Sequence, residues 1–275
     1  MLEFEILVRG LYRPDHLDIT YNPSLRMPTS PAIQQWMNSL WAQKLAMARA
    51  QGFPLFDAPL YRFVNAVARA DGALHLTLGD TGYKEYVTTR TPAFFSGRER
   101  HELGNALSAC SVVETSDGHI LLDKRQGVDV YVGRYHVIGG FFERERDSTP
   151  GALSAQPDPF GAIRREIREE TGIQPADIQQ QYCLGVVYDL ATPHAELCFV
   201  TRLHISLAEV KTREPEDDEI KQMESLRVTA ESLRAFIVQQ RGNISATGEP
   251  NLLLYGELRF GKQWLDDVLA QITNE

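Results

Sequence analysis

One run of nine residues, Arg165 to Ile173, constrains this chain more than any other feature; it reads Arg-Glu-Ile-Arg-Glu-Glu-Thr-Gly-Ile. In a helix, Glu166, Glu169 and Glu170 occupy positions i, i+3 and i+4 and therefore share one face. Gly172 supplies the left-handed residue that commonly ends a helix. Two of the carboxylates then lie in the last turn, where the helix dipole already presents negative charge. Such a row is unfavourable unless a cation lies beside it, and carboxylate oxygens suit a hard ion such as Mg²⁺.

A solvated surface helix is the alternative interpretation. Arg164, Arg165 and Arg168 are interleaved with the acids, and Arg165 can pair with Glu169 four residues later. Composition alone favours this alternative. The complete pattern, Arg-Glu-apolar-x-Glu-Glu-x-Gly-apolar, nevertheless occurs by chance in only about one chain in 10⁴ to 10⁵ at ordinary residue frequencies. The pattern therefore indicates a functional site.

A second motif precedes the helix. Tyr135 to Glu143 reads as a strand followed by a Gly-Gly-x-x-Glu turn, with its glycines at Gly139 and Gly140. The two motifs together resemble the Nudix box, which marks Mg²⁺-dependent hydrolases of nucleoside diphosphates linked to another group. The resemblance covers roughly residues 107–275. It implies an α/β fold, the Nudix α/β/α sandwich with a mixed sheet.

The same resemblance implies roles for individual residues. Glu166, Glu169 and Glu170 correspond to the metal ligands, together with the carbonyl of Gly140. Arg165 would orient the glutamates, and these four charged residues are the predicted catalytic set. The expected cofactor is Mg²⁺, with Mn²⁺ as an alternative ion, because such an ion neutralises a diphosphate and activates a water for attack on phosphorus.

The box departs from the family pattern in its spacing. Gly140 and Arg165 are twenty-five residues apart, which is longer than the pattern, so residues 144–157 are interpreted as an inserted loop. Pro157 stands where the pattern has a glutamate, and Ile138 where it has a proline. Because the expected metal-binding carboxylates are all present, the insertion concerns loop geometry and substrate choice more than metal binding.

The charge of the chain is unevenly distributed. Residues 1–104 carry 11 Lys and Arg against 10 Asp and Glu, whereas residues 105–275 carry 17 against 27. An acidic domain needs metal ions to meet a polyanionic substrate, and it lacks the basic stripe of a nucleic-acid binder. We therefore expect a small nucleotide as the partner, and no nucleic acid.

Cysteine usage and hydropathy suggest the compartment. Cys110, Cys183 and Cys198 are odd in number, lack C-x-x-C spacing and lie in apolar runs, which favours a reducing compartment. No apolar run approaches the length of a membrane span. These features predict a cytoplasmic protein without a membrane partner. The oligomeric state stays open, with a homodimer as one arrangement.

Local patterns divide the chain into two parts. We expect a small α+β N-terminal domain over residues 1–104 and the Nudix domain over residues 105–275. Alternation and turn residues predict strands at 2–8, 61–70, 73–78, 108–125 (a hairpin), 131–138, 182–190, 197–205 and 226–228, and helices at 31–52, 159–171, 232–240 and 251–271. Residues 13–31 contain four prolines and are predicted to be loop.

The N-terminal part of the sequence indicates which subgroup of the family the chain resembles. Leu55 to Pro59, Leu76 to Gly79, and the neighbouring Tyr83 and Lys84 resemble the extra domain of the UDP-glucose/UDP-galactose diphosphatase subgroup. That subgroup also has an enlarged loop between the paired glycines and the helix. The resemblance implies hydrolysis of a UDP-sugar to UMP and a sugar 1-phosphate. Two alternatives remain: a Nudix hydrolase of another nucleotide, such as ADP-ribose or an ADP-sugar, and a non-catalytic nucleotide-sensing module.

Three residues are predicted to bind the substrate outside the box. Tyr83 and Lys84 could present an aromatic face and an ammonium to a base and a phosphate, and His136 lies on the strand before the paired glycines. The alternative for Tyr83 and Lys84 is that their region only completes the core or a dimer interface. The loop from Lys211 to Glu219 is either a solvated linker or the source of an additional base or ligand, from Glu216 to Glu219.

Overall fold

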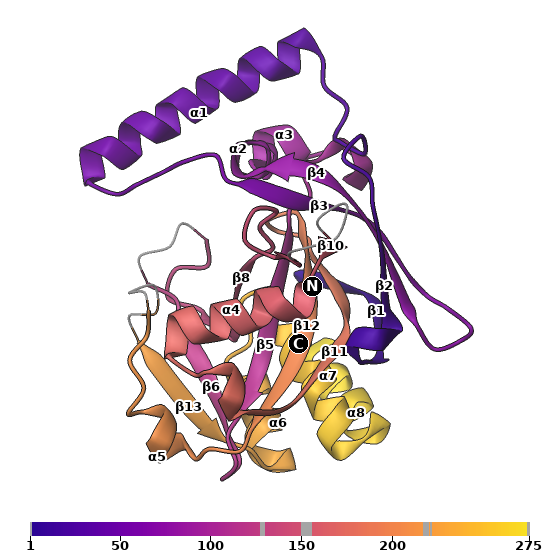
Figure 1. Ribbon diagram of the computed structural model, residues 1–275, viewed down its shortest axis with the longest axis vertical. Coiled ribbons are helices and arrows are strands. Elements are labelled where there is room, and N and C mark those ends of the chain that lie inside the picture. The colour runs from indigo at the N-terminus through magenta and orange to yellow at the C-terminus, as the bar shows by residue number, and fades with distance from the viewer. Residues whose placement is uncertain (1, 127–129, 150–155, 217–219, 221, 274–275) are drawn as a thin grey trace.

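The computed structural model describes residues 2–126, 130–149, 156–216, 220 and 222–273. A large sheet lies at its centre, with the strand order β1-β11-β12-β5-β6-β13, and with β7 beside β6 and β8 beside β5 (Figure 1). Its strands are β1 (Phe4–Tyr12), β5 (Leu107–Glu114), β6 (His119–Lys124), β7 (Tyr135–His136), β8 (Ile138–Phe141), β11 (Ile178–Asp189), β12 (His194–Leu203) and β13 (Met223–Arg227). β12 and β5 are parallel and the other pairs are antiparallel, so the sheet is mixed as predicted.

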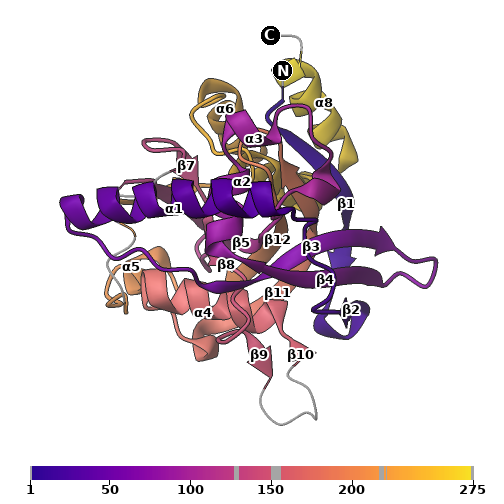
Figure 2. The ribbon, with the colours of Figure 1, turned by 90° about the horizontal axis from the view of Figure 1, so that it is seen from above.

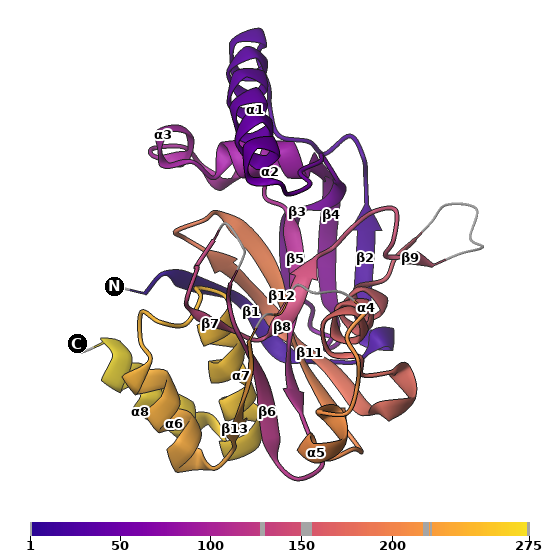
Figure 3. The same ribbon diagram turned by 90° about the vertical axis from the view of Figure 1, so that its left-hand side faces the viewer.

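Helices cover both faces of this sheet. α4 (Pro159–Thr171) packs on one face, and α6 (Ala230–Gln239), α7 (Gly248–Phe260) and α8 (Lys262–Thr273) pack on the other (Figure 3). The short helix α5 (Leu207–Val210) follows β12. Gly261, with a φ of 88°, separates α7 from α8 within the stretch expected to be helical. The predicted α/β/α sandwich is confirmed.

The N-terminal part has a smaller sheet of its own, with the order β2-β4-β3. Its elements are β2 (Leu17–Tyr21), α1 (Pro31–Gln51), β3 (Pro59–Ala68), β4 (Leu74–Gly82), α2 (Tyr83–Thr89) and α3 (Pro92–Phe95). The prediction that residues 13–31 are all loop is wrong, because β2 pairs in parallel with β4. The partner strand lies more than fifty residues later, and prolines flank β2, so the local sequence does not reveal the pairing.

Local start and stop residues act as expected in the first helix. The hydroxyl of Ser30 accepts a hydrogen bond from the backbone N–H of Ile33 at 3.2 Å, and Pro31 occupies the first turn. Gly52 ends α1 in the left-handed conformation, with a φ of 79°. α1 then crosses above the rest of the molecule (Figures 1 and 2).

The N-terminal part of the chain packs directly against the part that follows residue 104. β1 pairs with β11 in the large sheet, and Tyr61 on β3 donates its backbone N–H to the carbonyl of Phe142 at 3.0 Å. Leucines of β4 belong to the same buried cluster as Phe160 and Ile163 of α4. The boundary near residue 104 stays a prediction.

The insertion before α4 contains two short paired strands, β9 (Ser148–Thr149) and β10 (Gln156–Pro157). Residues 150–155, within the predicted inserted loop, lie outside the described residues. None of the described helices is long and apolar enough to cross a membrane.

Candidate active site

α4 carries the acidic row and directs it inward. The carboxylate of Asp158 accepts from the backbone N–H of Gly161 at 2.9 Å, and Gly172 ends the helix with a φ of 72°. The four predicted catalytic side chains, Arg165, Glu166, Glu169 and Glu170, are between 5 and 9% exposed. A solvated helix face would leave them in water, so the surface-helix alternative is wrong.

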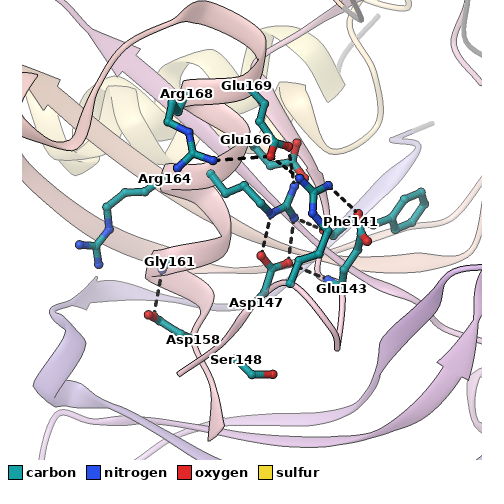
Figure 4. A network of polar contacts seen from close by, with 12 residues as sticks. Phe141, Glu143, Asp147, Ser148, Asp158, Gly161, Arg164, Glu166, Arg168 and Glu169 are labelled. Carbon is teal, nitrogen blue, oxygen red and sulfur yellow. Dashed lines mark hydrogen bonds and ion pairs between the residues drawn. The ribbon is translucent and has the colours of Figure 1, made fainter. Parts of the chain in front are cut away.

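Arg165 is the centre of a carboxylate network. Figure 4 shows the acids of this network, Asp147, Glu166 and Glu169, close together. Its Nε and Nη2 donate to the two carboxylate oxygens of Asp147 at 2.7 and 2.8 Å, a bidentate pairing. Its Nη1 lies 2.8 Å from Glu166 Oε1 and 3.0 Å from Glu169 Oε2, which confirms the expected pairing between positions 165 and 169. Burial alone would lower the pKa of Arg165, but these carboxylates raise that pKa above its ordinary value. The guanidinium therefore stays charged and fixes the acids around it.

The remaining acids have defined partners as well. Arg146, from the predicted inserted loop, pairs with Glu169 and lies 3.4 Å from Glu143. Glu170 accepts a hydrogen bond from the backbone N–H of Gly139 at 3.2 Å. This hydrogen bond joins helix α4 directly to the paired glycines of β8.

The paired glycines are required by close approach. A Cβ on Gly140 would lie 2.6 Å from a carboxylate oxygen of Glu166, and one on Gly139 would lie 2.2 Å from the carbonyl oxygen of Ala109. At position 139 the nearest neighbouring atoms are backbone, so only glycine fits there, and at position 140 the absent Cβ lets the Glu166 carboxylate lie against β8. The acidic side chains beside this glycine backbone form an oxygen-rich donor set that fits a hard divalent cation.

A cavity of about 530 Å³ opens beside these acids, and Glu166, Glu169 and Gly140 line it. This volume is typical of a small-molecule site. The N-terminal part supplies the opposite wall, with apolar side chains from α1, the connector after it and α2: Met47, Ala48, Phe53, Pro54, Leu55, Tyr83, Tyr86 and Val87. Five cationic side chains of the described residues also line the cavity: Lys44, Arg90, Arg125, Arg146 and Arg165.

Another buried acid, which does not belong to α4, also lines the cavity. Glu196 on β12 is 3% exposed, and the imidazoles of His136 and His194 lie within 4 Å of its carboxylate. Burial raises the pKa of Glu196, but the two imidazoles and the Thr247 hydroxyl outweigh that effect and lower the pKa to about 2. Glu196 is therefore an ionised carboxylate inside the protein.

The predicted substrate-binding residues are distributed unequally. Tyr83 and His136 line the cavity, whereas Lys84 does not; its ammonium donates to Asn38 on α1. Glu216 pairs with Arg168 at 3.0 Å and does not line the cavity. Residues 217–219 of the same loop lie outside the described residues.

Sequence reasoning missed two acids. It treated residues 144–157 as inserted, yet Asp147 within them is the bidentate partner of Arg165. The extra length thus begins after this acid, and a search for any acid downstream of Gly140 would have found it. It also passed over Glu196, a lone acid in the buried strand β12; a charged residue inside an apolar run was the available indication.

Comparison with known families and structures gives one family. Residues 104–247, more than half of the chain, match the model of the NUDIX domain. No curated protein matches the sequence. Nudix hydrolases generally use divalent metal ions such as Mg²⁺ or Mn²⁺.

Several solved structures are similar in part. The NUDIX domain of Shewanella oneidensis NrtR, complexed with ADP ribose, is 12% identical, with a TM-score of 0.42 over 61% of this chain and 97% of that one. DR0079 from Deinococcus radiodurans is 18% identical, with a TM-score of 0.37 over 55% and 81%. The MutT protein from Methanosarcina mazei Go1 is 17% identical, with a TM-score of 0.36 over 57% and 96%.

Proposed function

The chain belongs to the Nudix family, and we propose that it hydrolyses the diphosphate bond of a UDP-sugar to UMP and a sugar 1-phosphate. In this reaction the oxygen of a water forms a bond to one phosphorus. The bond between that phosphorus and the bridging oxygen breaks, and the water gives up a proton. Both products therefore carry a terminal phosphate.

The donor set supports a divalent cation at α4. Glu166, Glu169 and Glu170 would hold it, together with the backbone of Gly140, whose missing Cβ leaves space for the Glu166 carboxylate. When bound, such an ion neutralises the diphosphate and lowers the pKa of a bound water. We propose Mg²⁺ as the ion, with Mn²⁺ as an alternative.

The protein's own residues position this chemistry. Asp147 holds Arg165 in a bidentate grip, and Arg165 in turn holds Glu166 and Glu169. Their side chains are ordered before a substrate arrives, so less entropy is lost on binding. Arg146 and Arg125 line the same cavity and can meet phosphate oxygens.

One observation supports a substrate larger than a simple nucleotide phosphate. The cavity does not end at α4; it continues to a wall built by the N-terminal part, where Phe53, Leu55 and Tyr83 offer apolar and aromatic surface. A base or sugar beyond the diphosphate would lie against this wall. The choice of uridine rests on the resemblance of this N-terminal part to the UDP-sugar diphosphatase subgroup.

A nucleotide panel tests the proposal. Purified protein with Mg²⁺ is given UDP-glucose, UDP-galactose, ADP-ribose, NADH and diadenosine polyphosphates, and the released mononucleotide is quantified. We expect the highest kcat/KM for a UDP-sugar, and loss of turnover when EDTA removes the metal. Preference for ADP-ribose would overturn the choice of substrate, and tight binding without turnover would point to a sensing module.

A further inference from the structure

The far end of the cavity contains a carboxylate that the hydrolysis of a diphosphate does not use. Glu196 on β12 lies beside Ser108 on β5, and Ser108 lies beside Phe141 on β8. Two strand spacings, about 10 Å, therefore separate Glu196 from the backbone next to Gly140. This distance places Glu196 beyond the diphosphate-binding region, in the part of the cavity left for a ring attached to it.

Two imidazoles approach this carboxylate without filling its hydrogen-bonding capacity. His136 Nε2 lies 3.8 Å from Glu196 Oε1, and His194 Nε2 lies 3.9 Å from Glu196 Oε2. Both separations exceed the roughly 3.2 Å limit of an N–H···O hydrogen bond. A carboxylate has about four acceptor positions. The Thr247 hydroxyl hydrogen-bonds to this carboxylate and fills one of these positions. Glu196 therefore lines the cavity as a buried acceptor with further positions for incoming donors.

Surrounding hydrogen bonds fix the direction of both rings. Ser245 Oγ accepts from the backbone N–H of Gly248 at 3.1 Å and lies 2.6 Å from Nδ1 of His136, a contact that directs Nε2 of this ring toward Glu196. Nδ1 of His194 donates to the carbonyl of Thr192 at 2.6 Å. The site is therefore built before a ligand arrives, with its polar side chains held by the backbone.

The charges of this site identify the chemistry of its ligand. An ionised carboxylate repels phosphate, so the diphosphate does not lie here. Two carboxylate oxygens match two adjacent hydroxyl groups, because each hydroxyl donates one hydrogen bond. We propose that Glu196, flanked by His136 and His194, binds the vicinal hydroxyls of a substrate sugar ring. That ring is either the ribose of the nucleotide or the sugar beyond the diphosphate.

A metal ion is the competing ligand for the same residues. Ligand atoms of Cys110, His136 and Glu196 lie within 4.8 Å of one another. A metal needs the thiolate form of cysteine. Burial raises the pKa of Cys110 well above its ordinary value, and its Sγ already accepts from Asn251 Nδ2 at 3.1 Å. The neutral, engaged thiol favours the sugar over the ion.

The proposal rests on the proposed function, and the test separates the two. kcat/KM is measured for UDP-glucose, its 2′-deoxyribose analogue and its 2-deoxyglucose analogue, with the parent protein, Glu196→Gln and Glu114→Gln. Glu114 is a matched control, since it is equally buried and paired with Arg202 at 3.1 Å, near the other end of β5 from Ser108. If the parent cleaves neither UDP-glucose nor UDP-galactose, the proposed function fails, and the best panel nucleotide and its deoxy analogues replace UDP-glucose in this test.

We expect Glu196→Gln to lower kcat/KM about 10- to 100-fold on the full substrate, the effect of losing hydrogen bonds to a charged group. The parent should lose a similar factor on one deoxy analogue, and the variant should lose little more on that analogue. The analogue that shows this identifies the ring. Glu114→Gln should retain the parental kcat/KM.

Three results would overturn the proposal. In the first, Glu196→Gln keeps the parental kcat/KM. In the second, it is impaired but remains as sensitive to each missing hydroxyl as the parent, which would mean a structural role. In the third, Zn²⁺ is retained through dialysis at one ion per parent chain and is lost in Glu196→Gln. If Glu196→Gln does not fold, Glu196→Asp replaces it, because it keeps the charge and withdraws the carboxylate by one methylene.

Discussion

The two ends of the cavity bury acids in opposite ways. At α4, Glu166, Glu169 and Glu170 lie together with Asp147, and Arg165 is the buried cation among them. At the far end the lining carboxylate is Glu196, which faces two imidazoles, and one of these, His194, also lies 3.8 Å from the buried Asp189. The first end keeps an excess of negative charge, so it attracts a cation. The second end surrounds its lining carboxylate with imidazoles and a hydroxyl group, so it suits a neutral ligand that donates hydrogen bonds. Buried acids alone therefore do not identify a metal site; the balance of charge around them does.

The largest fall in activity is expected from a substitution at the α4 end of the cavity. Glu169→Gln removes one negative charge from the metal-binding set while keeping the shape of the side chain. With saturating Mg²⁺, we expect kcat for UMP release to fall about 100-fold or more. Glu114→Gln, which also neutralises a buried acid that pairs with arginine, should retain the parental kcat. Equal kcat in Glu169→Gln and the parent would contradict the metal-binding role of this helix.

A smaller effect is expected one step further from the metal. Asp147→Asn weakens the bidentate pairing with Arg165. Because the guanidinium is then less firmly held by residue 147, it competes with the ion for Glu166 and Glu169. We expect kcat/KM to fall about tenfold, and more Mg²⁺ to be needed for half-maximal activity. The measurement is a Mg²⁺ titration of the rate. If the melting temperature falls and the Mg²⁺ dependence does not move, Asp147 has only a structural role.

A substitution in the cavity wall that the N-terminal part supplies should have a weaker effect, which changes substrate binding and leaves the chemical step unchanged. Phe53 and Phe56 lie three residues apart and are both exposed, at 54 and 68%, but only Phe53 lines the cavity. Phe53→Ala should raise KM about three- to tenfold through lost contact with a base or sugar ring, with kcat unchanged. Phe56→Ala is the matched control. Identical KM values in both variants would leave the wall without a role in substrate binding.

The smallest effect concerns stability at acid pH. The folded pKa of Glu196, about 2, lies below its ordinary value of 4.5. Its contribution to stability is therefore fully present above pH 4.5 and is lost as the pH falls toward 2. In Glu196→Gln the melting temperature should fall less steeply over this interval than in the parent. Parallel curves for parent and variant would contradict an ionised Glu196.

The same two ends show what the sequence could and could not predict. The α4 end was predictable because its information is local: a capping Asp158, a row of glutamates on one face and a terminal Gly172 lie within fifteen residues. The paired glycines were predictable for the same reason. Arg165 and its pairing with Glu169 followed from helical spacing alone.

The far end was predicted only in part. His136 was predicted to bind the substrate from its place before the paired glycines, but its neighbours come from other elements. His136 lies on β7, Glu196 on β12, and Ser245 follows α6, so only the folded sheet brings them together. The parallel pairing of β2 with β4 was missed for this reason too. Asp147 was missed because its distance from Arg165 in the chain departs from the expected spacing, although its chemistry does not.

A crystal soaked with Mn²⁺ tests the difference between the two ends most directly. Anomalous scattering locates the ion without any assumption about the substrate. The account predicts a peak beside the carboxylates of Glu166 and Glu169, at roughly 2.0–2.3 Å from their oxygens, and no peak among Cys110, His136 and Glu196. A peak in the second place and none in the first would contradict the assignment of both ends.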